Sequence, residues 1–479
     1  MVYYNDKFLA EYKFIDLDES ALHAFSEIYP FAYVDKFIES VNINNVYLLN
    51  TRRYLRDLLE YGYFEVVSPA TGRSIRSGSS IVLRDRVTVF SFPDEPEFLL
   101  SIGDLGAGFP ICAAILADCR LLLRIGKYNW GFAPRHLPLL NDVIAATGWA
   151  PTPATGEPSI VLGDANFAHH VWNELSCLED LVVSGNAPKF MYTVVNESIG
   201  PLSELFEELR GARFRRATDQ TIEKLNGYGT LNFPLGGRII TRTLIERIFR
   251  YCEMRISPEC KTLRDRVRAL SGPILWVSIR TRNRTPINQV EFLARLGRDF
   301  LERFAGSGII IDGFSFAANF GEFDANRRAV VREICEEDSV IAGALAEKLT
   351  MGFDGDRVFS AVGLMINDSI LLGREAEFYI CHHGTVQHKV GWFNATPGIV
   401  HCNELVTASL PSVWVASKSE VAVRPQYLPV QMIKDVPLTG QQKQRATLSN
   451  QDNYAVADMD NALQFFRTAV DACAWSART

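Results

Sequence analysis

Residues 273–296, PILWVSIRTRNRTPINQVEFLARL, predict a buried strand, a cationic loop and a helix in succession. The strand runs straight into three arginines, which are Arg280, Arg282 and Arg284. After Pro286, the spacing of Asn288 and Glu291 is that of a capping box, which opens a helix. A cationic loop between a strand and a helix N-terminus is suited to bind an anion. This stretch therefore predicts an anion site whose ligand is a phosphate.

The composition is that of a soluble globular enzyme. Of the 479 residues, 47% are hydrophobic and 22% are charged, and the chain is long enough for roughly two to four domains. The formal net charge is -7, whereas a general nucleic-acid binder carries a basic surplus, so we expect no nucleic acid as a partner. Nine cysteines without a CxxC pair indicate reduced thiols rather than a disulfide framework or a zinc site.

The sequence gives no sign of export or of a membrane span. Its N-terminus, MVYYNDKFLAEYKF, lacks the basic and apolar regions of a signal peptide. The most apolar run, 111–125, is interrupted by charged residues and is too short to cross a bilayer. We therefore expect a cytoplasmic protein, with peripheral association at the inner face of a membrane as an alternative.

Strand and helix patterns alternate from residue 159 onward, which predicts an α/β fold with parallel sheets. The pattern restarts at Pro273, so we expect two Rossmann-like domains that meet near 260–272. Strands are expected at 159–164, 189–195, 274–279, 308–311, 377–381 and 398–402. Helices are expected at 166–183, 202–209, 288–304, 325–348, 385–393 and 459–473.

The N-terminal part has a different pattern and carries no chemistry that the sequence identifies. Short β-branched runs between turn residues predict a β-meander at 62–102, and an apolar helical segment is expected at 110–147. Three prolines in 149–159 predict a linker. The expected domains are the α+β accessory region 1–150, the first Rossmann-like domain 151–268, the second 269–435, and a tail 436–479. The tail is expected to be polar and loop-like to residue 452 and to end in a helix that packs back on the body.

A second stretch that could carry chemistry is 377–404, EFYICHHGTVQHKVGWFNATPGIVHCNE. A buried strand ends there at His383 and Gly384; glycine lets a ligand approach the backbone, and histidine can donate to a phosphate oxygen. Asn403 and Glu404 end the next strand, where they could accept hydrogen bonds from ribose hydroxyls. The alternative is that the histidines are satisfied within the sheet edge. Because no carboxylate falls at ligand spacing from His383 and His388, we expect no metal site.

The third stretch is 163–174, GDANFAHHVWNE, in which Asp164 or Asn166 is expected to cap a helix. On that helix His169 faces Asn173, and His170 faces Glu174, each four residues apart. A histidine in the first turn of a helix that follows a strand is well placed to act as a general base. The alternative is an ordinary His–Glu pair on a helix surface.

Together, the three stretches resemble glycosyltransferase family 61 and its bacterial relatives over roughly residues 160–405. The motif Asn-aromatic-x-His is matched by residues 166–169, and the strand-end arginine motif by 278–280 with Arg284 and the helix start 287–291. The His-Gly motif is matched by 383–386, followed by a Pro-Gly pair and a strand that leads to Glu404. Val386 and Lys389 differ from the residues usual in the family. Arg282 matches no motif position and is expected at the surface.

The resemblance implies a GT-B fold and an inverting, metal-independent transfer of a hexose or pentose. The donor would be a nucleotide-sugar and the acceptor a glycan or polysaccharide, with no further cofactor. His169 would act as the base, with Asp164 and Glu174 behind it. The donor would be bound by Arg280, Arg284, Asn288, His383, Gly384, Thr385, Asn403 and Glu404. Two alternatives are an enzyme like polysaccharide pyruvyltransferases, which would bind phosphoenolpyruvate, and a non-catalytic nucleotide- or glycan-binding protein of the same fold.

Overall fold

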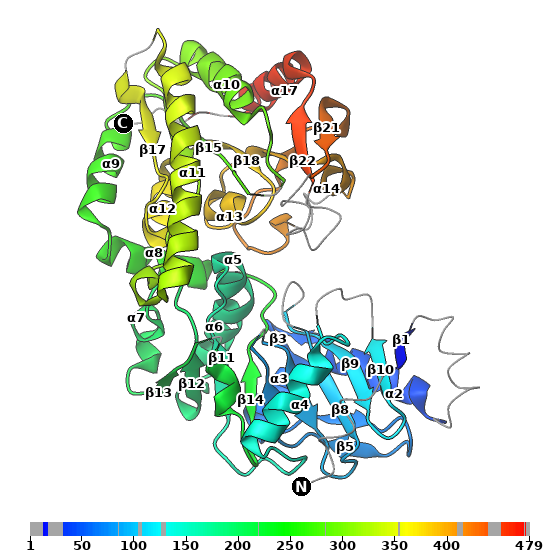
Figure 1. Cartoon of the computed structure of the whole chain (residues 1–479). Coiled ribbons are helices and arrows are strands. Elements are labelled where there is room, and N and C mark those ends of the chain that lie inside the picture. The colour runs from blue at the N-terminus through cyan, green and yellow to red at the C-terminus, as the bar shows by residue number, and fades with distance from the viewer. Residues whose placement is uncertain are drawn as a thin grey trace. The chain divides into compact units, whose positions relative to one another are not determined.

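The computed structural model divides into two compact units (Figure 1). It describes residues 13–17, 32–84, 86–103, 108–125, 131–218, 220–282, 284–352, 355–409, 415–438, 452–473 and 475. Unit 1 comprises Met1–Ala165, His169–Glu197 and Leu202–Ile239, and unit 2 comprises Asn166–Ala168, Ser198–Pro201 and Ile240–Thr479. The chain therefore changes units at Ile240, and the helices before Pro273 belong to unit 2. Most of the expected polar tail, at 439–451, lies outside the described residues.

The first sheet of unit 1 has six strands in the order β1-β10-β9-β8-β7-β6. Neighbours are antiparallel except β1 and β10, which are parallel. The strands are β1 (Lys13–Leu17), β6 (Ser80–Val82), β7 (Thr88–Ser91), β8 (Phe98–Ile102), β9 (Ile111–Leu116) and β10 (Leu121–Ile125). The predicted meander is confirmed by β6, β7 and β8, with a separate hairpin of β4 (Glu65–Val67) and β5 (Ser74–Arg76) before them.

The helix that we expected at 110–147 is wrong over its first half. Residues 111–125 form the hairpin of β9 and β10, and helix α4 (His136–Thr147) begins only afterwards. All six residues of β9 are buried, and Arg120 has a φ of +52° in the turn between the strands. An apolar run that is buried on both faces shows neither a helical nor a strand period, so its pattern could not distinguish the two.

The second sheet of unit 1 is parallel, with four strands in the order β13-β12-β11-β14. The strands are β11 (Ser159–Leu162), β12 (Met191–Val194), β13 (Arg213–Arg216) and β14 (Asn232–Pro234). The helical segment after β11 is continuous: α5 (Phe167–His169), a π-helical piece at His170–Leu175 and α6 (Ser176–Val183). The predictions of a strand at 159–164 and a helix at 166–183 are confirmed.

Unit 2 is built on a six-stranded parallel sheet in the order β17-β16-β15-β18-β19-β20. The strands are β15 (Ile274–Ser278), β16 (Gly308–Asp312), β17 (Val358–Ser360), β18 (Phe378–His382), β19 (Gly398–His401) and β20 (Gln426–Tyr427). The chain builds outward from β15 to β17 and then returns to place β18 on the other side of β15. This is the strand order of dinucleotide-binding folds, in which ligands bind at the carboxyl edge where the order reverses.

Helices cover both faces of this sheet, as an all-parallel sheet requires. Side chains of β15 alternate: Leu275 and Val277 face one core, and Ile274 and Trp276 face the other. The first core is closed by α10 (Gln289–Arg303), α11 (Ala325–Thr350) and α17 (Met459–Asp471). The second is closed by α9 (Pro258–Arg268), α12 (Ile366–Leu372) and α13 (Thr385–Gly391). The predicted strands and helices of this half are confirmed to within three residues at each end.

The expected C-terminal helix is confirmed as α17, which packs beside α10 (Figure 1). Phe466 on α17 is buried and contacts the rings of Phe300 and Phe378, at centroid distances of 6.5 and 6.1 Å. All nine cysteines are free thiols. Among the described residues, none of the helices combines the length and the apolar character needed to cross a bilayer.

Phe466→Ala is expected to lower the free energy of unfolding by about 3–5 kcal/mol, because it removes a fully buried ring and leaves a cavity. Urea denaturation followed by circular dichroism measures the change. Gln464→Ala, at an exposed position of the same helix, is the control and should stay within about 0.5 kcal/mol of the wild type. Equal losses in the two variants would contradict this account of how α17 packs.

Candidate functional site

The arginine loop and Gly384 lie at the point where the strand order of unit 2 reverses. The loop follows β15, and Gly384 follows β18, which is paired with β15. Both strands are parallel, so their carboxyl ends meet at the same edge of the sheet. The structure thus brings together two stretches that are about a hundred residues apart in the sequence.

Two guanidinium groups converge on Gly384. A Cβ atom placed on this glycine would lie 3.4 Å from Arg280 Nη1 and 3.7 Å from Arg284 Nη2. Gly384 has a φ of +127°, a conformation that side chains other than glycine rarely adopt. Arg284 itself has a φ of +47°, so the loop places this guanidinium at some cost in backbone strain.

The arginine pair places two neighbouring cations in a partly buried position. Burial, and then the neighbouring charge of Arg284, lower the pKa of Arg280 to about 10, so the group remains a cation at neutral pH. Arg284 Nε is buried and has no hydrogen-bond partner within the part of the chain that the structure describes. Two cations in a place of limited solvation favour the binding of an anion.

The loop is fixed by Gln289 and by the C-terminal strand β22 (Asn453–Val456). Gln289 Oε1 accepts from the Arg280 backbone N–H at 3.0 Å, and its Nε2 donates to the Arg280 carbonyl at 2.8 Å. Thr285 N–H donates to Asn453 Oδ1 at 2.8 Å. Asn288 exchanges two hydrogen bonds with the backbone of Val456, at 2.9 and 3.1 Å. The backbone of the arginine loop is therefore held from both sides.

The predicted capping box is wrong. Helix α10 does begin after Asn288, but the side chain of Asn288 makes no capping hydrogen bond. Instead, this side chain donates to the Val456 carbonyl. Glu291 pairs with Lys348 at 3.0 Å and does not reach back to the cap. The backbone partner of Asn288 lies 168 residues further along the chain, beyond the reach of a local pattern. Asn288 thus supports the loop rather than a ligand.

Arg282, which we expected at the surface, is half-exposed and pairs with Glu333 and Glu337 of α11 at 3.4 and 2.8 Å. Its charge is therefore compensated by the carboxylates of α11.

His383 is placed beside the arginine pair, and its Nδ1 lies 2.7 Å from the hydroxyl of Tyr427. Burial and the charges of Arg284 and Arg280 lower the pKa of His383 to about 3, so its ring is neutral at physiological pH. Thr385 is the first residue of α13, and its hydroxyl donates to Asn166, which clusters with unit 2. Tyr427 gave no signal in the sequence analysis because its strand has only two residues.

Asn403 and Glu404 are occupied by contacts within the protein. Asn403 is fully buried; its Oδ1 caps helix α14 (Glu404–Ala408), and its Nδ2 donates to the Asp452 carbonyl at 3.1 Å. Glu404 accepts from the Asp435 backbone N–H at 3.0 Å. The structure gives Asn403 a role in the helix cap, and neither side chain is directed by these contacts toward a ligand.

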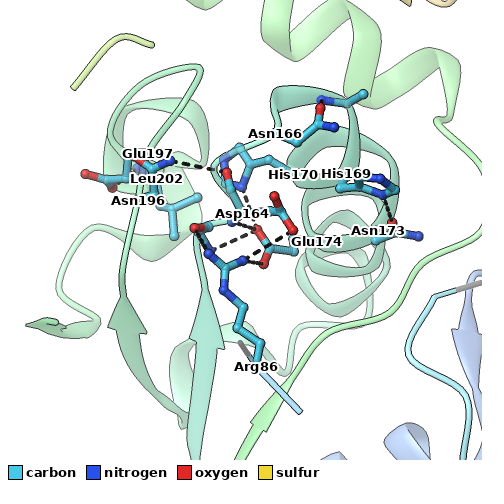
Figure 2. A network of polar contacts seen from close by, with 12 residues as sticks. Arg86, Asp164, Asn166, His169, His170, Asn173, Glu174, Asn196, Glu197 and Leu202 are labelled. Carbon is cyan, nitrogen blue, oxygen red and sulfur yellow. Dashed lines mark hydrogen bonds and ion pairs between the residues drawn. The ribbon is translucent and has the colours of Figure 1, made fainter. Parts of the chain in front are cut away.

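In unit 1, a buried ion cluster lies at the carboxyl end of β11 (Figure 2). Glu174 Oε2 accepts from His170 Nδ1 at 2.6 Å and from the backbone N–H groups of Gly163 and Asp164, both at 2.9 Å. Arg86 Nη1 lies 3.2 Å from Glu174 Oε1 and 3.5 Å from Asp164 Oδ2. Burial alone would raise the pKa of Glu174, but the hydrogen bond from His170 and the charge of Arg86 hold it below its ordinary value.

The expected support of His169 by Asp164 and Glu174 is not what the structure contains. His169 lies on another side of the helix, with Nδ1 3.0 Å from Asn173 Oδ1, while Glu174 is used by His170 and Arg86 (Figure 2). The predicted pairing of His169 with Asn173 and of His170 with Glu174 is confirmed. The predicted cap at Asn166 is also confirmed, because Asn166 Oδ1 accepts from the backbone N–H of Ala168 at 3.1 Å. Arg86, which completes the cluster, comes from a distant turn that carries no recognisable motif.

The contacts of Asn173 define which nitrogen of His169 carries the proton. Asn173 Nδ2 donates to the Gly237 carbonyl at 3.2 Å, which directs Oδ1 toward His169. An oxygen acceptor requires that His169 Nδ1 be the donor, which leaves Nε2 with a free electron pair. His169 is half-buried, whereas His170 is fully buried and cannot meet a substrate. Of the two, only His169 can act as a base.

No family model matches this chain, and no curated protein matches it.

Within the described residues, no group of three or more histidine, cysteine, aspartate or glutamate side chains is arranged to hold a metal ion. His388, the third histidine of its stretch, is stacked on Trp392 with ring centroids 3.6 Å apart and contacts Gln387. These contacts lie within α13 and with Trp392, the residue that follows it.

His401→Gln is expected to flatten the dependence of stability on pH. Burial lowers the pKa of His401 to about 3, so below about pH 6.5 only the unfolded chain takes up this proton, and stability falls with pH. From about pH 7 to about pH 5, the wild type should lose about 2 kcal/mol more of its unfolding free energy than the variant. Urea denaturation at both pH values measures this, and parallel losses would contradict it.

Proposed function

We propose that this protein is a glycosyltransferase that takes its sugar from a nucleotide-sugar and needs no metal ion. The observation that carries the proposal is the pair of guanidinium groups above Gly384, at the carboxyl edge where the strand order reverses. A GT-B arrangement of the two units, inversion at the transferred sugar and a glycan or polysaccharide acceptor are parts of the same proposal.

The charge of the site suits a nucleoside diphosphate as leaving group. As the bond to the sugar breaks, negative charge grows on the diphosphate, and preorganised cations stabilise it without reorganisation. Arginine offers planar pairs of N–H donors that match phosphate oxygens, and two of them can bind two phosphates. The neutral ring of His383 supplies a further hydrogen-bonding group beside them.

The β15–α10 connection also favours a diphosphate bound by side chains. Dinucleotide-binding folds use a glycine-rich turn here, which lets the pyrophosphate reach the helix N-terminus. In this protein the connection carries arginines, and the side chain of Gln289 at the start of α10 is bound to the loop backbone. Binding by guanidinium groups therefore replaces binding by the helix end.

His169 is the proposed base that takes the proton from the acceptor hydroxyl. Its Nε2 carries the free electron pair because Nδ1 donates to Asn173. Asp164 and Glu174 act only indirectly in this proposal, since they neutralise Arg86 and hold the start of the helix. A pyruvyltransferase acting on phosphoenolpyruvate, or a protein that binds a nucleotide without turnover, would use the same arginine pair.

Arg284→Ala is expected to abolish the rise in melting temperature that nucleotide-sugars produce, because one of the two phosphate-binding cations is lost. Thermal-shift measurements with UDP-, GDP-, CMP- and TDP-sugars and with phosphoenolpyruvate provide the readout. Arg282→Ala is the matched control: it removes a cation from the same loop, but one that is paired with carboxylates, and should keep the full shift. A shift with phosphoenolpyruvate alone would support the pyruvyltransferase, and no shift with any nucleotide would contradict the proposal.

His169→Gln is expected to lower kcat by about 100-fold or more, because glutamine can replace the contact with Asn173 but cannot take up a proton. The affinity for the donor should be unchanged in the same variant. Transfer to the acceptor and donor binding are measured in parallel, so that a folding defect would be seen in both. Full transfer activity of the variant would show that His169 is not the base.

A further inference from the structure

Tyr427 lies at the carboxyl end of β20, where Val400 of β19 is its partner in the sheet. Its hydroxyl is 2.7 Å from Nδ1 of His383, the residue that lies beside the arginine pair. Neither the resemblance nor the motifs of the sequence included this tyrosine. Its contact raises the question of which atom carries the hydrogen.

The hydrogen-bond requirements of both side chains are met if Tyr427 is the donor. Burial raises the pKa of Tyr427 above its ordinary value, so the phenol keeps its hydrogen. Within the described residues, His383 Nδ1 is the one hydrogen-bond partner of this hydroxyl. If Nδ1 were the donor, the phenolic hydrogen would have no acceptor among the described residues, and this partly buried hydroxyl would forgo a hydrogen bond worth about 0.5–1.5 kcal/mol.

A neutral imidazole that accepts at Nδ1 must carry its hydrogen on Nε2. His383 is neutral because burial and the charges of Arg284 and Arg280 hold its pKa far below neutrality. Its Nε2–H can therefore donate to an anion without adding a third positive charge to a partly buried site that already contains two. A positively charged histidine there would increase the repulsion that the two arginines already experience.

We propose that Tyr427 is a positioning residue, whose hydroxyl fixes the Nε2–H form of His383 so that this group donates to the bound diphosphate. The inference rests on the proposed function for the identity of the anion. In this proposal the Nε2–H of His383 is a third, uncharged donor beside the two guanidinium groups. The direction in which it donates depends on Tyr427, which lies two strands away from β18.

The test combines Tyr427→Phe with nitrogen NMR of the side chains in protein labelled with ¹⁵N-histidine. The wild type should show the neutral Nε2–H form at His383, and the variant should show a mixture of the two neutral forms. Affinity for inorganic pyrophosphate and for UDP, measured by calorimetry, should fall by about fivefold to tenfold. Tyr192→Phe is the control, since it removes the hydrogen bond of a buried tyrosine to the Ala187 carbonyl in unit 1.

His383→Gln provides the second arm, because glutamine offers an N–H donor whose direction does not depend on Tyr427. In this background Tyr427→Phe should cause no further loss of affinity, so the two effects should not add. Full additivity, or a His383 signal that is unchanged in Tyr427→Phe, would overturn the inference. If the wild type bound neither pyrophosphate nor UDP, this would contradict both the proposed function and the role of His383 as a donor to the diphosphate. The NMR result would still decide whether Tyr427 fixes the Nε2–H form of His383.

Discussion

The repulsion between Arg280 and Arg284 is the constraint on which the site of unit 2 depends. Their guanidinium groups lie together above Gly384, where burial lowers the pKa of Arg280. Like charges at short range in a poorly solvated place push apart unless the backbone holds them. Gln289 and β22 provide that support through hydrogen bonds to the loop. An anion bound beside Gly384 would relieve the repulsion that remains, which is the electrostatic basis of the proposed phosphate-binding role.

The histidines near this pair are consistent with the same constraint. His382, His383 and His401 all have pKa values below the ordinary value, with burial as the largest cause. Each is bonded through Nδ1 to a hydroxyl group, of Ser278, Tyr427 and Tyr454 respectively. A hydroxyl partner satisfies a neutral ring, because it can donate to or accept from an imidazole nitrogen. The contrast with unit 1 is clear, where His170 is bonded to the carboxylate of Glu174 and a cation, Arg86, balances the cluster.

Much of the fold and part of the site could be predicted from local pattern. Hydrophobic periodicity predicts β11, β15 and β18, the strands that precede the three motif stretches. The four-residue spacing predicts the pairing of His169 with Asn173 and of His170 with Glu174. The hairpin at 111–125 could not be distinguished because its strands are apolar on both faces and so show no clear period. Asn288 and Arg86 were misjudged or missed because their partners lie 168 and 88 residues away in the chain. Local patterns contain no information about such partners.

The strand at Asn453–Val456 has a consequence for how the protein is made. The arginines of the anion site are synthesised well before this strand, yet the backbone of Thr285 and the side chain of Asn288 find their partners on it. A nascent chain that has emerged only as far as the end of β19 therefore contains the arginines and Gln289 but lacks the partners that β22 provides to Thr285 and Asn288. Formation of the proposed anion site would therefore require the chain through Val456, which supplies the backbone partners of Asn288.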